Sequence, residues 1–152
     1  YIGDGNNMAH SWLMLSSKLG LKLRIATPKG YEPNANIIEE AQKFAKKSNG
    51  EILITHDPKE AVADADVVTT DVWASMGQEA EREERKKIFA NYQINSELLA
   101  SAKPDAIVLH CLPAHRGEEI TDDVIDGSHS AVLDEAENRL HVQKALLAML
   151  VE

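Results

Sequence analysis

The hexapeptide HCLPAH places one cysteine between two histidines. Cys111 follows His110 directly, and His115 stands four residues further on. A thiol beside an imidazole is the pattern of a covalent nucleophile with its base, which is one hypothesis for Cys111. A metal ligand is a second, although no second cysteine or paired-histidine motif supplies the other ligands. A buried structural thiol is the third.

Leu112 and Pro113 favour a fourth interpretation, in which Cys111 lines a pocket at the end of a strand. The proline fixes the backbone and leaves the Leu112 carbonyl free to accept a hydrogen bond from a ligand. The thiol would then hydrogen-bond a substrate amine without covalent chemistry. The residues by themselves leave these interpretations open.

Asp71 follows a strongly apolar strand-like run and opens the loop DVWASMG. A carboxylate at the end of a strand can pair with a substrate ammonium group. Ser75 offers a hydroxyl to the same ligand, and Gly77 permits the loop to move. The alternative is structural: Asp71 caps the next helix and Trp73 fills a gap in the packing.

The segment GDGNN (Gly3–Asn7) has two of the three glycines of a dinucleotide-binding fingerprint. Met8 stands where the third glycine belongs, and the next strand ends at Thr27 without the acidic ribose ligand. A nicotinamide cofactor is therefore disfavoured. What remains is a glycine turn with two asparagines before a helix, which either caps the helix or binds an anion such as a carboxylate.

Arg139 lies near the start of the last predicted helix, where the helix dipole does not favour a cation. Turned toward a ligand crevice, its guanidinium would bind phosphate or polarise a carbonyl oxygen. The alternative is a surface ion pair with a neighbouring glutamate.

The elements that must position these residues alternate between strand and helix. Strands are predicted at Lys22–Thr27, Glu51–Thr55, Asp66–Thr70, Ala106–His110 and Ala131–Leu133. Helices are predicted at Asn7–Leu19, Asn34–Lys47, Glu135–Leu150 and, as a solvated charged helix with Glu81–Arg85 and Glu83–Lys87 pairs, Gln78–Tyr92. This alternation predicts an α/β fold with a mainly parallel sheet, whose ligands gather at the carboxyl ends of the strands.

Composition narrows the class of protein. The 152 residues carry 25 acidic against 16 basic side chains, a net charge of −9, which argues against nucleic-acid binding. No apolar run is long enough to span a bilayer, so we expect no membrane association. The single cysteine fits a reducing, cytoplasmic compartment. Because Tyr1–Gly5 reads as a strand end and its turn, we expect the chain to be a piece of a longer one.

Four segments together resemble the ornithine carbamoyltransferase family. They occur in that family's order and extend over essentially the whole chain: GDGNN (Gly3–Asn7), DVWASMGQE (Asp71–Glu79), HCLPAHRGEE (His110–Glu119) and AENRLHVQKA (Ala136–Ala145). The SMG loop is the most specific of them, because it separates the ornithine enzymes from aspartate-using relatives, which also lack the cysteine. The family's amino-terminal domain, with its Ser-Thr-Arg-Thr phosphate segment, has no counterpart here.

The resemblance implies that residues 1–152 form the ornithine-binding domain, a Rossmann-like three-layer domain with five or six strands, without the carbamoyl phosphate-binding domain. It implies that Asn7 binds the ornithine carboxylate, that Asp71 binds the α-ammonium, and that Ser75 and Met76 close over it. Cys111 and the Leu112 carbonyl would face the reacting amine and the carbamoyl group, and Arg139 would hold the carbamoyl oxygen. The residues to which the resemblance gives a role in the site are Asn7, Asp71, Ser75, Met76, Cys111, Leu112 and Arg139.

The implied reaction transfers the carbamoyl group of carbamoyl phosphate to the δ-amine of L-ornithine, giving citrulline and phosphate. It requires no metal and no organic cofactor, and the family forms homotrimers or larger homo-oligomers. We expect the isolated chain to be inactive. The alternatives are a carbamoyltransferase for another amine, such as putrescine or an acylated ornithine, and a non-catalytic amino-acid-binding domain.

Overall fold

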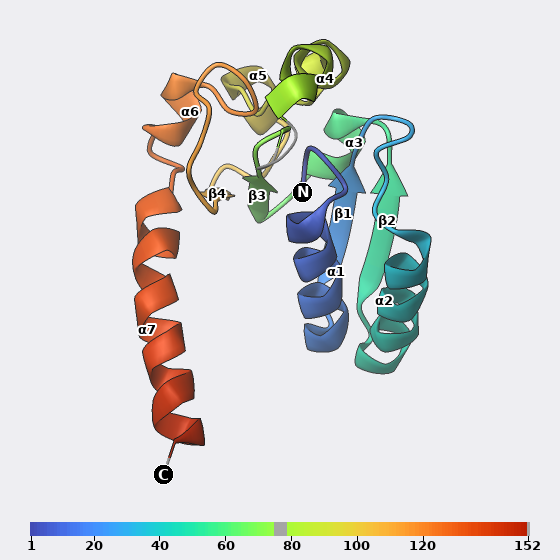
Figure 1. Cartoon of the computed structure of the whole chain (residues 1–152), viewed down its shortest axis with the longest axis vertical. Coiled ribbons are helices and arrows are strands. Elements are labelled where there is room, and N and C mark those ends of the chain that lie inside the picture. The colour runs from blue at the N-terminus through green and yellow to red at the C-terminus, as the bar shows by residue number, and fades with distance from the viewer. Residues whose placement is uncertain (75–78, 152) are drawn as a thin grey trace.

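Figure 1 shows the computed structural model of the chain, which describes residues 1–74 and 79–151. The elements are α1 (Asn7–Leu19), β1 (Lys22–Ala26), α2 (Ala35–Ser48), β2 (Glu51–Thr55), α3 (Pro58–Val62), β3 (Val67–Thr70), the short 3-10 helix η1 (Glu79–Glu81), α4 (Arg82–Phe89), the 3-10 helix η2 (Ala90–Tyr92), α5 (Ser96–Leu99), β4 (Ile107–His110), α6 (Asp122–Ile125) and α7 (Val132–Leu150). The predicted α/β class is confirmed, with parallel strand pairs separated by helices.

The strands pair in parallel as β1 with β2 and β3 with β4. The backbone of Ile2 contacts both strand pairs. Ile2 forms a parallel bridge with Ala26 of β1, and its amide donates to the carbonyl of Thr69 in β3 at 2.9 Å. Ser130 forms a further bridge with Val108 beyond β4. Over the described residues the regular strands therefore form two two-stranded sheets, and the predicted sheet of five or six strands is not confirmed.

The predicted strand at 131–133 is wrong, because Val132 begins α7. The apolar run is followed by Asp134 and Glu135, which lie in the first turn of the helix. Acidic side chains there are stabilised by the helix dipole, so the run continues into a helix instead of extending as a strand.

The other long helices agree with the sequence pattern. α1 has the predicted bounds: Asn6 accepts from the Met8 amide at its start, and Gly20 ends it in the left-handed conformation at φ 72°. α2 is displaced by one residue from its prediction, and α7 starts earlier. The predicted charged helix is α4 with a 3-10 turn on each side, while Gln78 lies outside the described residues.

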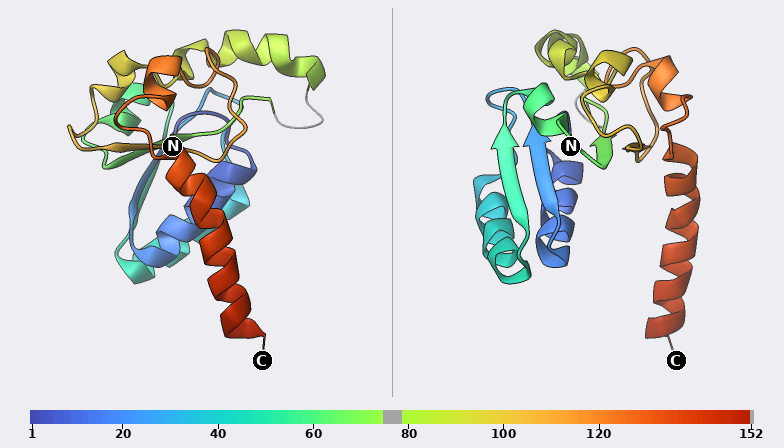
Figure 2. Two further views of the ribbon diagram at one scale, coloured as in Figure 1. Left: turned by 90° about the vertical axis from the view of Figure 1, so that its left-hand side faces the viewer. Right: turned by 180° about the vertical axis from the view of Figure 1, so that it is seen from behind.

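The helices lie unevenly around the strands. α1 and α2 pack side by side on one face of β1 and β2, and the view from behind shows both strands in front of these helices (Figure 2). α4, α5 and α6 gather at the carboxyl ends of the strands, whereas α7 contacts β4 and extends away from the other elements (Figures 1 and 2). None of the helices in the described residues is both long and apolar enough to cross a bilayer.

An aromatic cluster supports the carboxyl ends of the strands. Phe89 of α4 is fully buried, stacks on Trp73 at 5.8 Å between ring centroids, and meets the edges of Tyr31 and Tyr92. Burying a phenylalanine contributes roughly 1.5–3 kcal/mol, and each aromatic pair adds roughly 0.5–1.5 kcal/mol. The cluster therefore fixes α4 over the loop that begins at Asp71.

Candidate substrate-binding site

The carboxyl ends of β3 and β4 bring Asp71 and Cys111 into contact. The Cys111 thiol donates to Asp71 Oδ1, with 3.3 Å between sulfur and oxygen, and the Val72 amide donates to the same oxygen at 2.8 Å. Asp71 is buried, with 7 % of its surface exposed. A Cβ on Gly3 would lie 3.3 Å from Thr70 Oγ1, so the turn before α1 lies directly against the carboxyl end of β3.

The thiol of Cys111 is held in its neutral form. Burial, followed by the negative charge of Asp71, raises the pKa of Cys111 to about 12. A nucleophilic cysteine needs the opposite shift and an imidazole that takes its proton. His110 is fully buried and faces other partners, so the arrangement disfavours covalent chemistry and favours a thiol that hydrogen-bonds a ligand.

His110 and Glu119 form a buried pair behind the cysteine. His110 Nε2 lies 3.0 Å from Glu119 Oε1, and both side chains are completely inaccessible to solvent. The Leu112 amide donates to His110 Nδ1 at 2.9 Å, and the His115 amide donates to Glu119 Oε1 at 2.6 Å. These bonds enclose the turn that carries Cys111, and Leu112 within it adopts the left-handed conformation at φ 55°.

A hollow between this turn and α7 collects three of the predicted site residues. Cys111, Leu112 and Arg139 line it together, and the remaining lining residues are Pro113, Ala136, Leu140 and Gln143. Arg139 is exposed on α7 and lies in the second turn, later than its predicted place at the start of that helix. The hollow therefore has a thiol on one side and a guanidinium on the other.

Of the other predicted substrate-binding residues, only Asn7 belongs to the part of the chain that the structure describes. Asn7 is the first residue of α1 and is exposed, with its carbonyl accepting from Ser11. Within residues 1–74 and 79–151, no hydrogen bond joins Asn7 to Asp71 or Cys111. Ser75 and Met76, predicted to close over the substrate, lie outside the described residues, as does Gly77.

The buried ion pair of Arg85 with Asp4 was not predicted from the sequence. Arg85 of α4 donates to Asp4 at 2.6 Å and to the Trp73 carbonyl at 2.9 Å, with its guanidinium over the Tyr31 ring. Arg85 also pairs with Glu81, as predicted, but it is buried instead of solvated. Burial raises the pKa of Asp4, although the hydrogen bond from Arg85 acts in the opposite direction.

Tyr1 is a second buried group that sequence patterns did not reveal. Its hydroxyl donates to the Asp4 carbonyl at 3.1 Å. Burial, followed by the charges of Asp71 and Asp4, raises the pKa of Tyr1 well above its ordinary value. The phenol of Tyr1 therefore stays protonated.

Two clusters have the residue types of metal ligands, namely Asp71 with His110 and Cys111, and His115 with Glu118 and Glu119. Several of their ligand atoms are already engaged in hydrogen bonds or ion pairs. Both ring nitrogens of His110 have partners, and Cys111 donates to Asp71. Glu118 accepts from Arg82 and pairs with Lys86 as well. The local hydrogen bonds thus fit a polar binding site better than a metal centre.

The sequence of the chain matches a family model. Residues 1–150 match the model described as aspartate/ornithine carbamoyltransferase, Asp/Orn binding domain. Ornithine carbamoyltransferase from Wolinella succinogenes is 61% identical over 150 residues, which cover 99% of this chain and 49% of that protein. The enzyme of the same name from Thermococcus kodakarensis is 59% identical over 151 residues, covering 99% of this chain and 48% of that protein.

Solved structures agree with this similarity. The structure of ornithine carbamoyltransferase from Pyrococcus furiosus superposes with a TM-score of 0.93 at 59% identity, covering 97% of this chain and 47% of that one. An N-acetyl-L-ornithine transcarbamylase superposes with a TM-score of 0.82 at 31% identity, covering 94% of this chain and 44% of that one. The chain spans about half the length of the curated relatives that it matches.

Proposed function

Because this chain belongs to the aspartate/ornithine carbamoyltransferase family, as its Asp/Orn-binding domain, we propose that it is the ornithine-binding half of a carbamoyltransferase. The whole enzyme would transfer the carbamoyl group of carbamoyl phosphate to the δ-amine of L-ornithine. The observation that carries the proposal is the contact of Cys111 with Asp71, at the rim of a hollow that also exposes Leu112 and Arg139.

Ornithine has three groups to be held. In our proposal the exposed side chain of Asn7 binds the α-carboxylate, and Asp71 binds the α-ammonium through Oδ2, since Oδ1 already accepts from Cys111 and Val72. Ser75 and Met76 close over the amino acid, as the resemblance implies. The δ-amine then reaches the hollow beside Cys111 and the Leu112 carbonyl.

The δ-amine must be neutral to attack, and an ordinary alkylamine has a pKa of about 10.4, so most of it is protonated near neutral pH. Removal from water lowers the pKa of such an amine. The Leu112 carbonyl accepts one of its N–H bonds, and the sulfur of Cys111, whose own proton points at Asp71, accepts another. Both contacts orient the nitrogen lone pair toward the carbamoyl carbon.

Transfer forms the bond from the δ-nitrogen to the carbamoyl carbon and breaks the bond from that carbon to the phosphate oxygen. Negative charge develops on the carbamoyl oxygen, which the Arg139 guanidinium stabilises. The proton lost by the amine leaves with the phosphate, so the products are citrulline and hydrogen phosphate. The site uses no metal and no organic cofactor in this scheme.

In our proposal the second substrate, carbamoyl phosphate, is bound by residues from outside this chain. The relatives are about twice as long, and the apolar side chains of α7 continue from the hollow without a covering element among the described residues. A phosphate-binding domain covering α7 would complete the site. We also propose that the two strand pairs, joined through Ile2 and extended by Ser130, belong to one mainly parallel sheet of five or six strands in a Rossmann-like three-layer domain. In this proposal the whole protein is a homotrimer or larger homo-oligomer and works in the cytoplasm.

The experiment is to measure carbamoyl transfer by the full-length protein with ornithine, N-acetylornithine, putrescine or aspartate. Turnover with ornithine far above that with the other amines is expected, and the 152-residue chain alone should form no citrulline. Preference for N-acetylornithine is the second candidate, because a relative of that name shares the fold. Ornithine binding without turnover of any amine would indicate a non-catalytic binding domain.

A further inference from the structure

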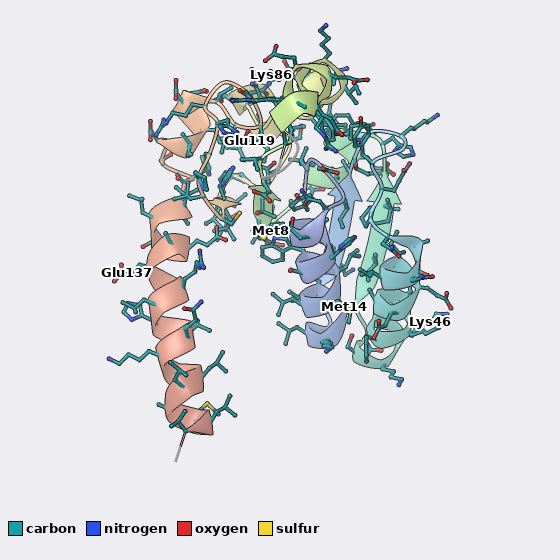
Figure 3. All side chains as sticks on the ribbon, in the orientation of Figure 1. Met8, Met14, Lys46, Lys86, Glu119 and Glu137 are labelled. Atoms are coloured by element: carbon teal, nitrogen blue, oxygen red, sulfur yellow. The ribbon has the colours of Figure 1, made fainter. Side chains whose placement is uncertain are left out.

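Glu119 lies in the interior beneath α4, where it is labelled in Figure 3. It and His110 are completely buried, and neither takes part in the proposed contacts with substrate. A buried carboxylate is costly unless it is paired or hydrogen-bonded. Its Oε2 has no hydrogen-bond partner among the described residues, and His115 Nδ1 lies 4.0 Å from this oxygen. Within that part of the chain, the hydrogen bonds of the Glu119 carboxylate therefore all run through Oε1, which faces His110 and the His115 amide.

The contacts of His110 define its tautomer. The Leu112 amide donates to Nδ1 at 2.9 Å, so Nδ1 must present a lone pair. The proton of a neutral imidazole then lies on Nε2, where it is donated to Glu119 Oε1 at 3.0 Å. The carboxylate therefore favours the one neutral form of the ring that can accept from Leu112.

The same carboxylate oxygen holds both ends of the turn. Through His110 it controls Leu112 at the start, and through the His115 amide at 2.6 Å it restrains the end. Leu112 has φ 55°, a conformation that residues with a Cβ seldom adopt unless the surroundings impose it. Cys111 and Leu112, which line the hollow, lie between these two restraints.

We propose that Glu119, acting through His110, is a positioning residue that fixes the Cys111–Leu112 turn for carbamoyl transfer. It sets the Nε2-protonated tautomer of His110, which accepts the Leu112 amide and holds the turn in its left-handed form. The kinetic part of this proposal rests on the proposed function, whereas the tautomer can be tested without any activity.

The kinetic test compares Glu119→Ala with Glu119→Gln in the full-length protein. The alanine variant loses the acceptor for His110 and should lower kcat by up to about a hundredfold, since the reacting groups are misplaced. KM for ornithine should change less, because the amino-acid head is held elsewhere. The glutamine amide oxygen still accepts, so Glu119→Gln should retain most of the activity. The matched control is Glu118→Ala, whose side chain pairs with Arg82 and Lys86 instead.

The structural test reads the tautomer of His110 from nitrogen-15 spectra of the histidine-labelled 152-residue chain, assigned by the loss of one signal in His110→Gln. We expect the Nε2-protonated form in the parent and in Glu119→Gln, and a mixture in Glu119→Ala. If the alanine variant does not fold, Glu119→Asp replaces it, since its shorter side chain cannot reach both partners.

An Nδ1-protonated or doubly protonated His110 in the parent would overturn the proposal, and so would a Glu119→Ala protein with parental kcat and tautomer. A full-length protein inactive toward every amine refutes the proposed function instead. In that case the spectra still decide whether Glu119 sets the tautomer of His110.

Discussion

The chemistry of Cys111 depends on its neighbour Asp71. Their contact at 3.3 Å uses the thiol proton, and the carboxylate charge adds to burial in raising the pKa of the thiol. A sulfur in this state presents lone pairs to an amine but carries very little thiolate. The pair can therefore orient a nucleophilic amine while remaining unreactive itself.

The thiol should resist alkylation. With a pKa of about 12, against an ordinary 9.0, its thiolate fraction at pH 8 is about a thousandth of that of a free cysteine, because each pKa unit changes it tenfold. Asp71→Asn removes the charge and should increase the rate by about tenfold or more. Iodoacetamide labelling of Cys111 followed by mass spectrometry measures both rates. The exposed Asp134→Asn is the control, and labelling of the parent as fast as a free thiol would contradict the prediction.

Arg139 should matter for the reaction and little for stability. It is exposed and lines the hollow with Cys111 and Leu112. Removing one group that stabilises developing oxyanion charge lowers kcat by about 10²–10³-fold, so Arg139→Ala should have that effect in the full-length protein. Lys144→Ala removes another exposed cation from α7 and should leave kcat near the parental value. Equal kcat values for the two variants would remove Arg139 from the proposed site.

The residues that could be predicted from the sequence are those whose neighbours follow from chain order. Cys111 and Leu112 come directly after β4, so their place at its carboxyl end follows from chain order. Arg139 lies on α7, beyond α6, and only packing brings it to the hollow that these residues line. Asp4 and Arg85 are 81 residues apart, and each alone resembles an ordinary surface charge. Only the packing of α4 over the strand ends brings them together, which no local pattern encodes.

At the scale of elements, α4 is anchored to the strand ends by Arg85. The guanidinium donates to Asp4 and to the Trp73 carbonyl, and both charged side chains are more than nine-tenths buried. Trp73 stands two residues after Asp71, so this anchor also fixes the segment that carries the Asp71 carboxylate. Together with the Phe89 cluster it ties α4 to the first turn of the chain.

Breaking the anchor should destabilise the fold. Arg85→Leu leaves Asp4 buried without its partner, which typically costs about 3–5 kcal/mol. Arg116→Leu breaks exposed pairs with Asp122 and Asp126 and should cost about 1 kcal/mol or less. Urea unfolding of the two variants measures this difference in the free energy of unfolding. Adding Asp4→Asn to Arg85→Leu should restore part of the loss, and equal stability of the two single variants would show that the buried pair is weak.

Element types were predicted well where the hydrophobic period was long or the strand was flanked by turns. The bounds of α1 and the four regular strands agree closely with their predictions. The error at 131–133 concerns three apolar residues, too few to distinguish a strand from the first turn of a helix.

The predicted ion pair between Glu83 and Lys87 was also wrong, because Glu83 pairs with Lys86. Side-chain direction within one helical turn decides such pairs, and sequence spacing does not specify it.

At the scale of the whole molecule, α7 is the least covered element. Its last helical residues, Ala145–Leu150, are all apolar, and the exposed side chains of α7 include Leu140, Val142, Leu147, Met149 and Leu150, each more than half exposed. A helical segment that is apolar on every side is normally buried, so the last turns of α7 have the composition of an interior helix. The face beside Cys111 is continuous with this surface through Leu140 and Gln143.

The 152-residue chain should therefore associate with itself in solution through α7. Sedimentation velocity should show the mean mass rising with protein concentration, because the exposed leucines leave water on association. The double change Leu147→Glu and Leu150→Glu should return the chain to a monomer by placing charges in the contact. Asn138→Glu adds charge to the exposed polar part of the same helix and should leave the association intact. A parent chain that stays monomeric at every concentration would mean that α7 packs back on its own domain in solution, and the proposed covering of α7 by a phosphate-binding domain would then lose its structural support.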